Sequence, residues 1–223
     1  MIRRMIPALL LGIAGCAVLI WLGVWQVQRL GWKTGIIDRI EATLAAEPVA
    51  VPAEPDPERD EYLRVLVSGV IEPGEAHVYT SVPERGVGYR VIVPLLLDDG
   101  RRVLLDRGFV PIAEKDAARH AGPIRVRGSL LWPDETDGFT DPPDLAKNIW
   151  FARDVARMSA ALDTVPVMVV TEASDDAAAP LALPVTVDIP NDHLGYAITW
   201  FGLAVGWAGM TVYWLWRIRS RTD

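Results

Sequence analysis

Two long uncharged runs lie near the two ends of the 223-residue chain, and they constrain its fold more than any other feature. Ile6–Trp25 holds 20 residues and Tyr196–Trp216 holds 21. At a helical rise of about 1.5 Å per residue, either run crosses a hydrocarbon core of roughly 30 Å. A backbone in lipid must satisfy its own hydrogen bonds, so both runs are predicted to be transmembrane helices. Between them, Gln28–Gly195 is long enough for one soluble domain with its own core.

The charged residues are distributed unevenly between this middle region and the two ends of the chain. The middle region contains 17 of the 22 Lys and Arg residues and 28 of the 29 Asp and Glu residues, for a net charge of −11. The two ends together carry +4. An acidic domain is repelled by phosphate backbones, which argues against nucleic acid as a partner.

The basic residues also predict how the chain is oriented in the membrane. Three arginines follow Trp216, and no basic residue lies between Thr171 and Gly195, so the C-terminus is predicted to be cytoplasmic. Two spans then place the N-terminus on the same side and the acidic domain on the periplasmic side. We expect a bacterial inner membrane, because no Arg- and Ser-rich transit peptide precedes the first span. The first span fits this rule less well, since Arg29 and Lys33 follow it.

The middle region has the pattern of a mostly β domain. Four prolines between Glu47 and Pro57 indicate an extended linker after a helical extension of the first span. Short strands separated by turns then favour a barrel- or sandwich-like fold over a parallel sheet. The predicted strands are 62–71, 76–81, 89–97, 101–106, 124–131, 165–172 and 185–189, with short helices at 113–120 and 154–162.

We therefore predict a membrane protein with two transmembrane α-helices that flank this soluble domain. The predicted segments are a cytoplasmic N-terminus (1–5), the first span (6–27), the extension and linker (28–57), the exported domain (58–190), the second span (191–216) and a basic tail (217–223). The lone cysteine, Cys16, lies inside the first span, so the exported domain has no disulfide. Residues 13–16 resemble a lipoprotein cleavage box, but the sequence stays apolar after Cys16, which favours an uncleaved anchor.

His193 is the strongest candidate for a functional residue. It lies at the start of the second span, and on a helix it shares one stripe with Tyr196 and Trp200. A neutral imidazole is a common axial ligand of haem iron. The alternative is an interfacial histidine that stacks on Tyr196 or bonds to a loop, and spacing alone favours this alternative.

A second group of candidates surrounds the point where the first span leaves the membrane. At 100° per residue, these aromatic, cationic and amide side chains fall within an arc of about 140°; they are Trp21, Trp25, Gln26, Arg29, Trp32 and Lys33. Aromatic residues beside cations are also common in an ordinary interfacial belt. The cations of Arg29 and Lys33, on the side where positive charge is unexpected, have a second interpretation as partners of haem propionates.

Other patterns carry less information. Gly202 and Gly206 form a GxxxG pattern that allows close helix approach, and Gly12, Gly15 and Cys16 form a small-residue patch on the first span. Enzyme motifs such as GxSxG, HExxH, Walker or GxGxxG do not occur, so catalysis is not indicated. We interpret His77 and His120 as solvated, and the Asp106-Arg107 pair as an ion pair between neighbours at the end of a strand.

Several motifs, in order along nearly the whole chain, resemble those of the surfeit locus protein one family. The most specific motifs are the first and the last, and those in the middle are weaker. They are Gly23-x-Trp25-Gln26-x-x-Arg29-x-x-Trp32-Lys33, Gly88-Tyr89, Leu105-Asp106-Arg107-Gly108-Phe109-Val110-Pro111, Asn148-Ile149-Trp150-Phe151 and Asn191-x-His193-Leu194-x-Tyr196-Ala197-x-x-Trp200. Phe109 stands where this family usually has tryptophan, and Asp192 replaces an asparagine beside the histidine.

The resemblance implies a non-enzymatic assembly factor of haem-copper cytochrome c oxidase in the respiratory chain. Such a protein binds haem A as transient cargo and helps deliver it to the catalytic subunit of the oxidase. Haem A synthase and membrane lipid are further expected partners. The resemblance also implies that His193 binds the haem iron, and we expect Trp25, Trp32, Tyr196 and Trp200 to flank the macrocycle. Two alternatives are a scaffold that never contacts haem and an envelope hydrolase with an unrecognised site.

The orientation is testable with reporters fused after Asp223, at the predicted cytoplasmic C-terminus. A fused green fluorescent protein should fluoresce and a fused alkaline phosphatase should be inactive, because the latter folds only after export. The opposite pair of signals would place the acidic domain in the cytoplasm and overturn the predicted topology.

Overall fold

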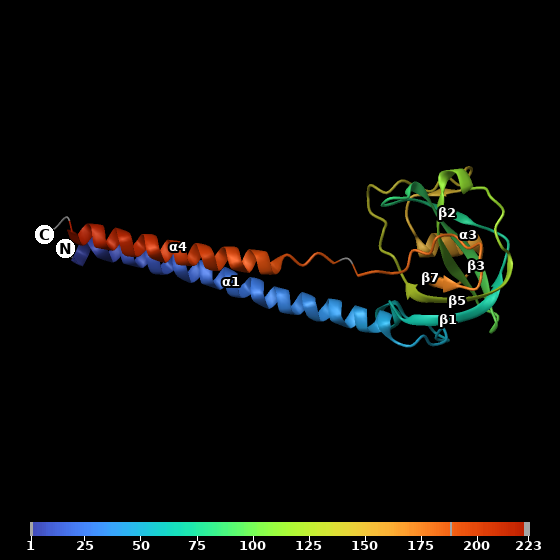
Figure 1. The fold of residues 1–223 in the computed structure, drawn as a ribbon, viewed down its shortest axis with the longest axis horizontal. Coiled ribbons are helices and arrows are strands. Elements are labelled where there is room, and N and C mark those ends of the chain that lie inside the picture. The colour runs from blue at the N-terminus through green and yellow to red at the C-terminus, as the bar shows by residue number, and fades with distance from the viewer. Residues whose placement is uncertain (1, 188, 221–223) are drawn as a thin grey trace. The chain divides into compact units, whose positions relative to one another are not determined.

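The computed structural model describes residues 2–187 and 189–220 of the chain (Figure 1). It contains two compact units. One is formed by the residues up to Arg39 together with those from Val187 onward, and the other by Ile40–Thr186. The first unit is helical and the second is built on a mixed seven-stranded sheet with short helices. This arrangement confirms the predicted fold class.

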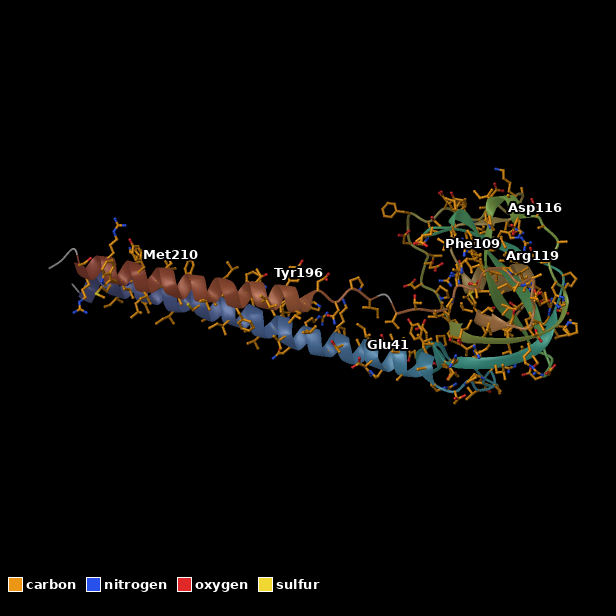
Figure 2. All side chains as sticks on the ribbon, in the orientation of Figure 1. Glu41, Phe109, Asp116, Arg119, Tyr196 and Met210 are labelled. Atoms are coloured by element: carbon orange, nitrogen blue, oxygen red, sulfur yellow. The ribbon has the colours of Figure 1, made fainter. Side chains whose placement is uncertain are left out.

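The helical unit is a pair of antiparallel helices (Figure 1). The helices are α1 (Ile2–Ala45) and α4 (His193–Ser220), and the start of α1 lies beside the end of α4. Both are long and apolar enough to cross a membrane, with mean hydropathies of 2.4 and 1.2 in their most apolar windows. Most of this apolar surface is exposed, as Figure 2 shows for the side chains around the pair. Exposed apolar side chains on such helices are expected where the solvent is lipid.

Small residues of α1 bring the two helices close together. A Cβ atom added to Gly12 or Gly15 would collide with the side chains of Thr211 or Trp207, and one added to Gly23 would lie 2.7 Å from Phe201. The indole Nε1 of Trp207 donates to the carbonyl oxygen of Gly12 at 3.2 Å. The seam therefore has the close backbone approach that small residues permit between membrane helices.

The glycines of α4 do not contribute to this seam. A Cβ added to Gly202 or Gly206 would meet no atom within 4 Å apart from those of its chain neighbours and of the surrounding turns of its own helix backbone. They lie on the face opposite His193, since nine and thirteen residues at 100° each amount to about half a turn from it. The small-residue patch of α1 thus packs against α4, whereas the expectation that the GxxxG pattern would mediate this approach is wrong.

The second unit is a small barrel with two added strands. The strands are β1 (Arg64–Ile71), β2 (Ala76–Val82), β3 (Gly86–Leu97), β4 (Arg102–Pro111), β5 (Gly122–Leu131), β6 (Ile149–Trp150) and β7 (Met168–Ser174). Their order in the sheet is β1-β5-β7-β4-β3-β2-β6, and β1 also pairs with β3. Five strands therefore close on themselves, and β2 and β6 extend the sheet beyond β3. The turn at Asp99-Gly100, with Gly100 at φ 86°, joins β3 to β4 as the sequence predicts.

The alternation of side chains along the strands creates two apolar cores. The first fills the barrel with fully buried aliphatic residues, among them Val65, Val91, Leu95, Val103, Leu105, Val126, Leu130 and Val169. The second lies on the other face of β3, β4 and β7, where α3 (Val155–Leu162) covers it with Val155 and Met158. Successive strand residues point to opposite faces, so one strand serves both cores.

Two predicted elements are absent where the sequence places them. Instead of a helix at 113–120 there is a single 3-10 turn, η1 (Ile112–Glu114), and the guanidinium of Arg119 bonds to the carbonyl oxygens of Glu114, Lys115 and Ala117. These bonds give carbonyl oxygens of a non-helical segment the partners that they would have in a helix. Residues 185–187 and 189 form no strand, and residue 188 lies outside the described residues.

The helix pairing is testable with the native cysteine. The Sγ atom of Cys16 lies 3.8 Å from the carbonyl oxygen of Ala204, and Ala204 is buried in the seam. We expect Ala204→Cys to form an intramolecular disulfide with Cys16 under mild oxidation, because the two positions face each other. The product should migrate faster on a non-reducing gel.

The matched control is Gly202→Cys, two residues away on the outer face of α4. It should give no intramolecular cross-link with Cys16. If Gly202→Cys cross-linked and Ala204→Cys did not, the rotation of α4 described here would be wrong.

Candidate functional site

The eight candidate residues of the two spans all belong to the helical unit. They are His193, Trp25, Gln26, Arg29, Trp32, Lys33, Tyr196 and Trp200. Contacts between α1 and the start of α4 bring the two groups together at the end of the hairpin where α4 begins. The two sequence motifs therefore lie together at one end of the hairpin.

The centre of this site is a hydrogen bond between the two helices. The Nδ1 atom of His193 lies 2.7 Å from the amide oxygen of Gln26, which is only 8% exposed. The amide oxygen of Gln26 faces Nδ1, and because an amide oxygen only accepts hydrogen bonds, this orientation requires the ring form that carries its proton on Nδ1. In that form the lone pair is on Nε2, which is then the atom that a metal ion can bind.

Two further bonds tie α1 to the segment before α4. The ammonium of Lys33 donates to the carbonyl oxygen of Pro190, and the amide nitrogen of Asn191 lies 3.3 Å from the hydroxyl of Thr34. The bond between Asn191 and Thr34 is not among the contacts that the sequence predicts. Two signals in the sequence point to Asn191: it begins the last of the motifs quoted above, and it lies just before the second span, where a side chain can meet the end of the first.

Arg29 has a different environment from Lys33. Its guanidinium lies over the ring of Trp32, 4.4 Å from the ring centroid, in a cation–π contact. Within the part of the chain that the structure describes, no carboxylate forms a salt bridge with Arg29. Arg29 lies on α1 between Gln26 and Lys33. Gln26 bonds to His193 at the start of α4, and Lys33 bonds to Pro190 in the segment before it. An exposed cation is therefore present within the candidate site.

The aromatic residues gather on one flank of the hairpin. Arg29 follows Gln26 by three residues, and Tyr196 follows His193 by three; Tyr196 is labelled near the start of α4 in Figure 2. Gln26 and His193 face each other across an antiparallel pair of helices. The residue three positions after either of them is rotated by about 60° from the facing direction, and on both helices this rotation is toward the same side of the pair. Trp25 and Trp32 lie on this flank by the same geometry.

The side chains of this flank are accessible. Trp25 is 46% exposed, Trp32 is 55% exposed and Tyr196 is 58% exposed, whereas Trp200 is half-buried near the seam. We call the group formed by His193, Trp25, Arg29, Trp32 and Tyr196 the aromatic flank. It offers a single imidazole nitrogen, a cation and broad ring surfaces. Among the described residues, no group of three or more His, Cys, Asp or Glu side chains is arranged to hold a metal ion.

A second cluster of polar residues lies in the barrel domain, on the side of the second core. The side chain of Asp106 is fully buried and accepts from Arg90 Nε at 2.7 Å and from Arg153 NH1 at 3.5 Å. Its other oxygen accepts from the backbone N–H of Gly108. Burial would lower the pKa of Arg153, but the carboxylates of Glu135 and Asp106 together outweigh this effect and raise it. A carboxylate neutralised by two guanidinium groups is poorly suited to act as a base or a nucleophile.

The predicted ion pair between Asp106 and Arg107 is not formed. Neighbours on a strand point to opposite faces, so Arg107 lies away from Asp106 and pairs instead with Asp176 at 2.9 Å. Burial lowers the pKa of Arg107, and the carboxylate of Asp176 acts against this shift.

The two remaining histidines also differ in environment. His77 is 5% exposed, and it bonds to Glu75 through Nε2 and to Asn148 through Nδ1, so the interpretation that it is solvated is wrong. Its position on β2, covered by the loop that carries Asn148, was not visible in the sequence. His120 is exposed, and its Nε2 lies 3.0 Å from the carbonyl oxygen of Pro123.

Comparison with known proteins shows that the chain matches a protein family and is similar to several of its members. The model of the SURF1 family matches residues 13–205, which include both halves of the helical unit and the barrel domain. A SURF1-like protein of Monosiga brevicollis is 30% identical over 204 residues, covering 82% of this chain and 77% of the relative. Surfeit locus protein 1 of Takifugu rubripes is 28% identical, covering 82% and 86%. The human surfeit locus protein 1 is 27% identical, covering 82% and 69%.

The structural role of the buried ion cluster is testable. We expect Asp106→Asn to lower the free energy of unfolding of the barrel domain by about 3 kcal/mol, because it leaves two buried guanidinium groups without their shared charge. Hydrogen exchange of β3 and β4 in the full-length protein measures this loss. Asp116→Asn is the control, since Asp116 is exposed, and its effect should stay within about 0.5 kcal/mol. Unchanged protection in Asp106→Asn would show that the cluster is not structural.

Proposed function

Because the chain belongs to the SURF1 family, we propose that it is a membrane-bound assembly factor for haem-copper cytochrome c oxidase. It binds haem A and aids the insertion of this cargo into the catalytic subunit. The observation that supports the proposal is the 2.7 Å contact between Nδ1 of His193 and the amide oxygen of Gln26, which favours the ring form with its lone pair on Nε2. This nitrogen binds the haem iron as an axial ligand.

The chemistry of His193 fits this role. Haem iron is commonly held by one imidazole nitrogen, while the other nitrogen donates to an oxygen of the protein. A single protein ligand also suits a carrier, because a cargo that must leave is released when one coordination bond is broken. Other axial ligands are not needed for the proposal, and the described part of the chain offers no cluster of further metal-binding side chains.

The charges near His193 suit the carboxylates of the cargo. Haem A carries two propionates, and the guanidinium of Arg29 has no salt bridge among the described residues. Charge-assisted hydrogen bonds from guanidinium to carboxylate are among the stronger polar contacts in proteins. Lys33 gives one N–H to Pro190, and its ammonium has two more donors for a carboxylate. The start of α4 at His193 adds the favourable end of a helix dipole for an anion.

The aromatic flank suits the apolar body of the cargo. Trp25, Trp32 and Tyr196 present large ring surfaces beside His193, and Trp200 lies half-buried one to two turns further along α4. Aromatic side chains contribute large apolar area and well-defined stacking geometry. The flank is exposed on helices that are long enough to span a membrane, so the farnesyl tail of haem A lies in lipid without exposing its apolar surface to water.

The proposal includes the location and partners of the protein. It lies in a bacterial inner membrane with both termini cytoplasmic and the acidic domain on the periplasmic side. The catalytic subunit of the oxidase receives the cargo, haem A synthase supplies it, and the protein itself performs no catalysis. The environment of Asp106 supports a non-enzymatic role, because this buried acid is held by Arg90 and Arg153 and is poorly suited to act as a base or a nucleophile.

The decisive test compares His193→Ala with the unchanged protein after co-production with the enzymes that make haem A. We expect haem A to co-purify with the unchanged protein and the variant to lose most of it, because the only axial ligand proposed here is removed. Visible absorption spectra of the purified proteins measure bound haem.

His120→Ala is the matched control, since His120 is an exposed histidine of the barrel domain. It should keep its haem. If His193→Ala retained the same haem content and the same spectrum as the unchanged protein, the ligand role would be lost and the scaffold that never contacts haem would be favoured.

A further inference from the structure

We propose that Gln26 is a positioning residue that sets the tautomer of His193 and, because it is neutral, keeps the imidazole a weak, releasable ligand. This inference rests on the proposed function, since the ligand is the axial nitrogen that the previous subsection assigns to haem. It concerns a residue that does not itself bind the cargo. The sequence had grouped Gln26 with the cofactor-binding residues only because it lies on the same arc as Trp25 and Arg29.

The geometry makes Gln26 the partner of the ring rather than of the cargo. Its amide oxygen lies 2.7 Å from Nδ1 of His193, and its side chain is buried between the helices. A free histidine in water exchanges its proton between the two ring nitrogens, and only one of these forms offers Nε2 to a metal. A fixed acceptor at Nδ1 selects that form before the cargo arrives.

The cost of burying an amide in an apolar span supports a specific role for this bond. Moving an amide from water to an apolar environment is unfavourable when the amide is not hydrogen-bonded. Most other seam positions of α1 are small or apolar, as at Ala8, Gly12 and Gly23. A leucine would pack at position 26 without this cost, so what the glutamine adds is its polar contact with His193.

The chemical type of the partner determines how strongly the imidazole binds. A carboxylate that accepts from the far nitrogen of a metal-bound histidine increases the electron donation of the ring to the metal. An amide oxygen orients the ring in the same way but adds no negative charge. A resident cofactor benefits from the stronger ligand, whereas a carrier must give its cargo away. The glutamine therefore combines a fixed tautomer with a bond that is weak enough to break.

The first experiment examines the protein without haem. Histidine labelled with nitrogen-15 distinguishes protonated from unprotonated ring nitrogens by their chemical shifts, and the His193→Ala variant identifies the signals of His193. We expect Nδ1 to be protonated and Nε2 unprotonated in the full-length protein in nanodiscs. Gln26→Leu should move His193 to a mixture of the two tautomers or to the opposite form.

Gln28→Leu is the matched control, because Gln28 is an exposed glutamine two residues further along α1. It should leave the signals of His193 unchanged. An unchanged Nδ1–H form in Gln26→Leu would overturn the inference. This result does not depend on haem, so it separates failure of the inference from failure of the proposed function, which His193→Ala tests.

The second experiment examines the same variants after loading with haem A. We expect Gln26→Leu to weaken haem binding by about 10-fold or more, the usual effect of losing such a partner. Gln26→Glu should retain the haem, lower its midpoint potential and slow its transfer to apo-myoglobin, because the added charge strengthens the ligand. Faster release and an unchanged midpoint potential in Gln26→Glu would contradict the proposed effect of charge.

A purely structural role of Gln26 gives a different result. If the bond only held the hairpin together, Gln26→Leu would also abolish the disulfide between Cys16 and Ala204→Cys, and Gln26→Glu would leave the midpoint potential unchanged. We expect the disulfide to form in the Gln26→Leu background, since the glycines of the seam remain in place.

Discussion

A polar side chain inside a membrane-length helix must find its hydrogen-bond partner within the protein, because lipid offers none. Gln26 of α1 satisfies this requirement with His193 at the start of α4. The small residues of the seam make the bond possible by allowing the helix backbones to approach closely, and the bond in turn sets which residues face each other. The position of His193, and hence of the whole candidate site, follows from this pairing.

Apolar side chains are buried in the barrel domain and exposed on the helical unit, and both arrangements follow from the unfavourable contact of apolar surface with water. In the barrel domain, aliphatic residues of five strands are removed from water into a closed interior, and a second core is covered by α3. In the helical unit, most apolar side chains of α1 and α4 stay exposed. Each arrangement places apolar surface away from water, the first by burial within the protein and the second by contact with lipid.

Much of this fold follows from patterns that the sequence displays directly. The two spans, the turn at Asp99-Gly100 and most strands depend on local hydropathy and turn chemistry, and the structure has them. The 113–120 segment could not be predicted in this way. Its carbonyl oxygens bond to Arg119, and whether a long side chain will fold back on its own segment is not visible in periodicity.

The candidate site, like the fold, was predictable from the sequence only in part. The residues of the site are predictable from the sequence, because an imidazole and several aromatic and cationic residues lie at the ends of two apolar runs that are expected to pair. The bond between Gln26 and His193 is not predictable, since it requires the relative rotation of two helices that are far apart in sequence. The GxxxG pattern of α4 indicated a packing face, but the rotation set at Gln26 and His193 turns Gly202 away from α1. The ion pair expected between Asp106 and Arg107 is absent for a simpler reason. Neighbours on a strand point to opposite faces, so each of these two residues pairs with a different partner.

If the chain carries haem A as proposed above, the exposure of the aromatic flank determines how the cargo is held and released. An enclosed pocket would bury all of the cargo and would need a conformational change to release it. A flank that is open to lipid covers only one side of a flat macrocycle, and the surrounding lipid solvates the rest. Transfer to another membrane protein then requires one imidazole bond to break and one pair of surfaces to separate, and the apolar cargo never enters water. The neutral partner at Gln26 serves the same end, because it orients His193 without strengthening the bond that has to break.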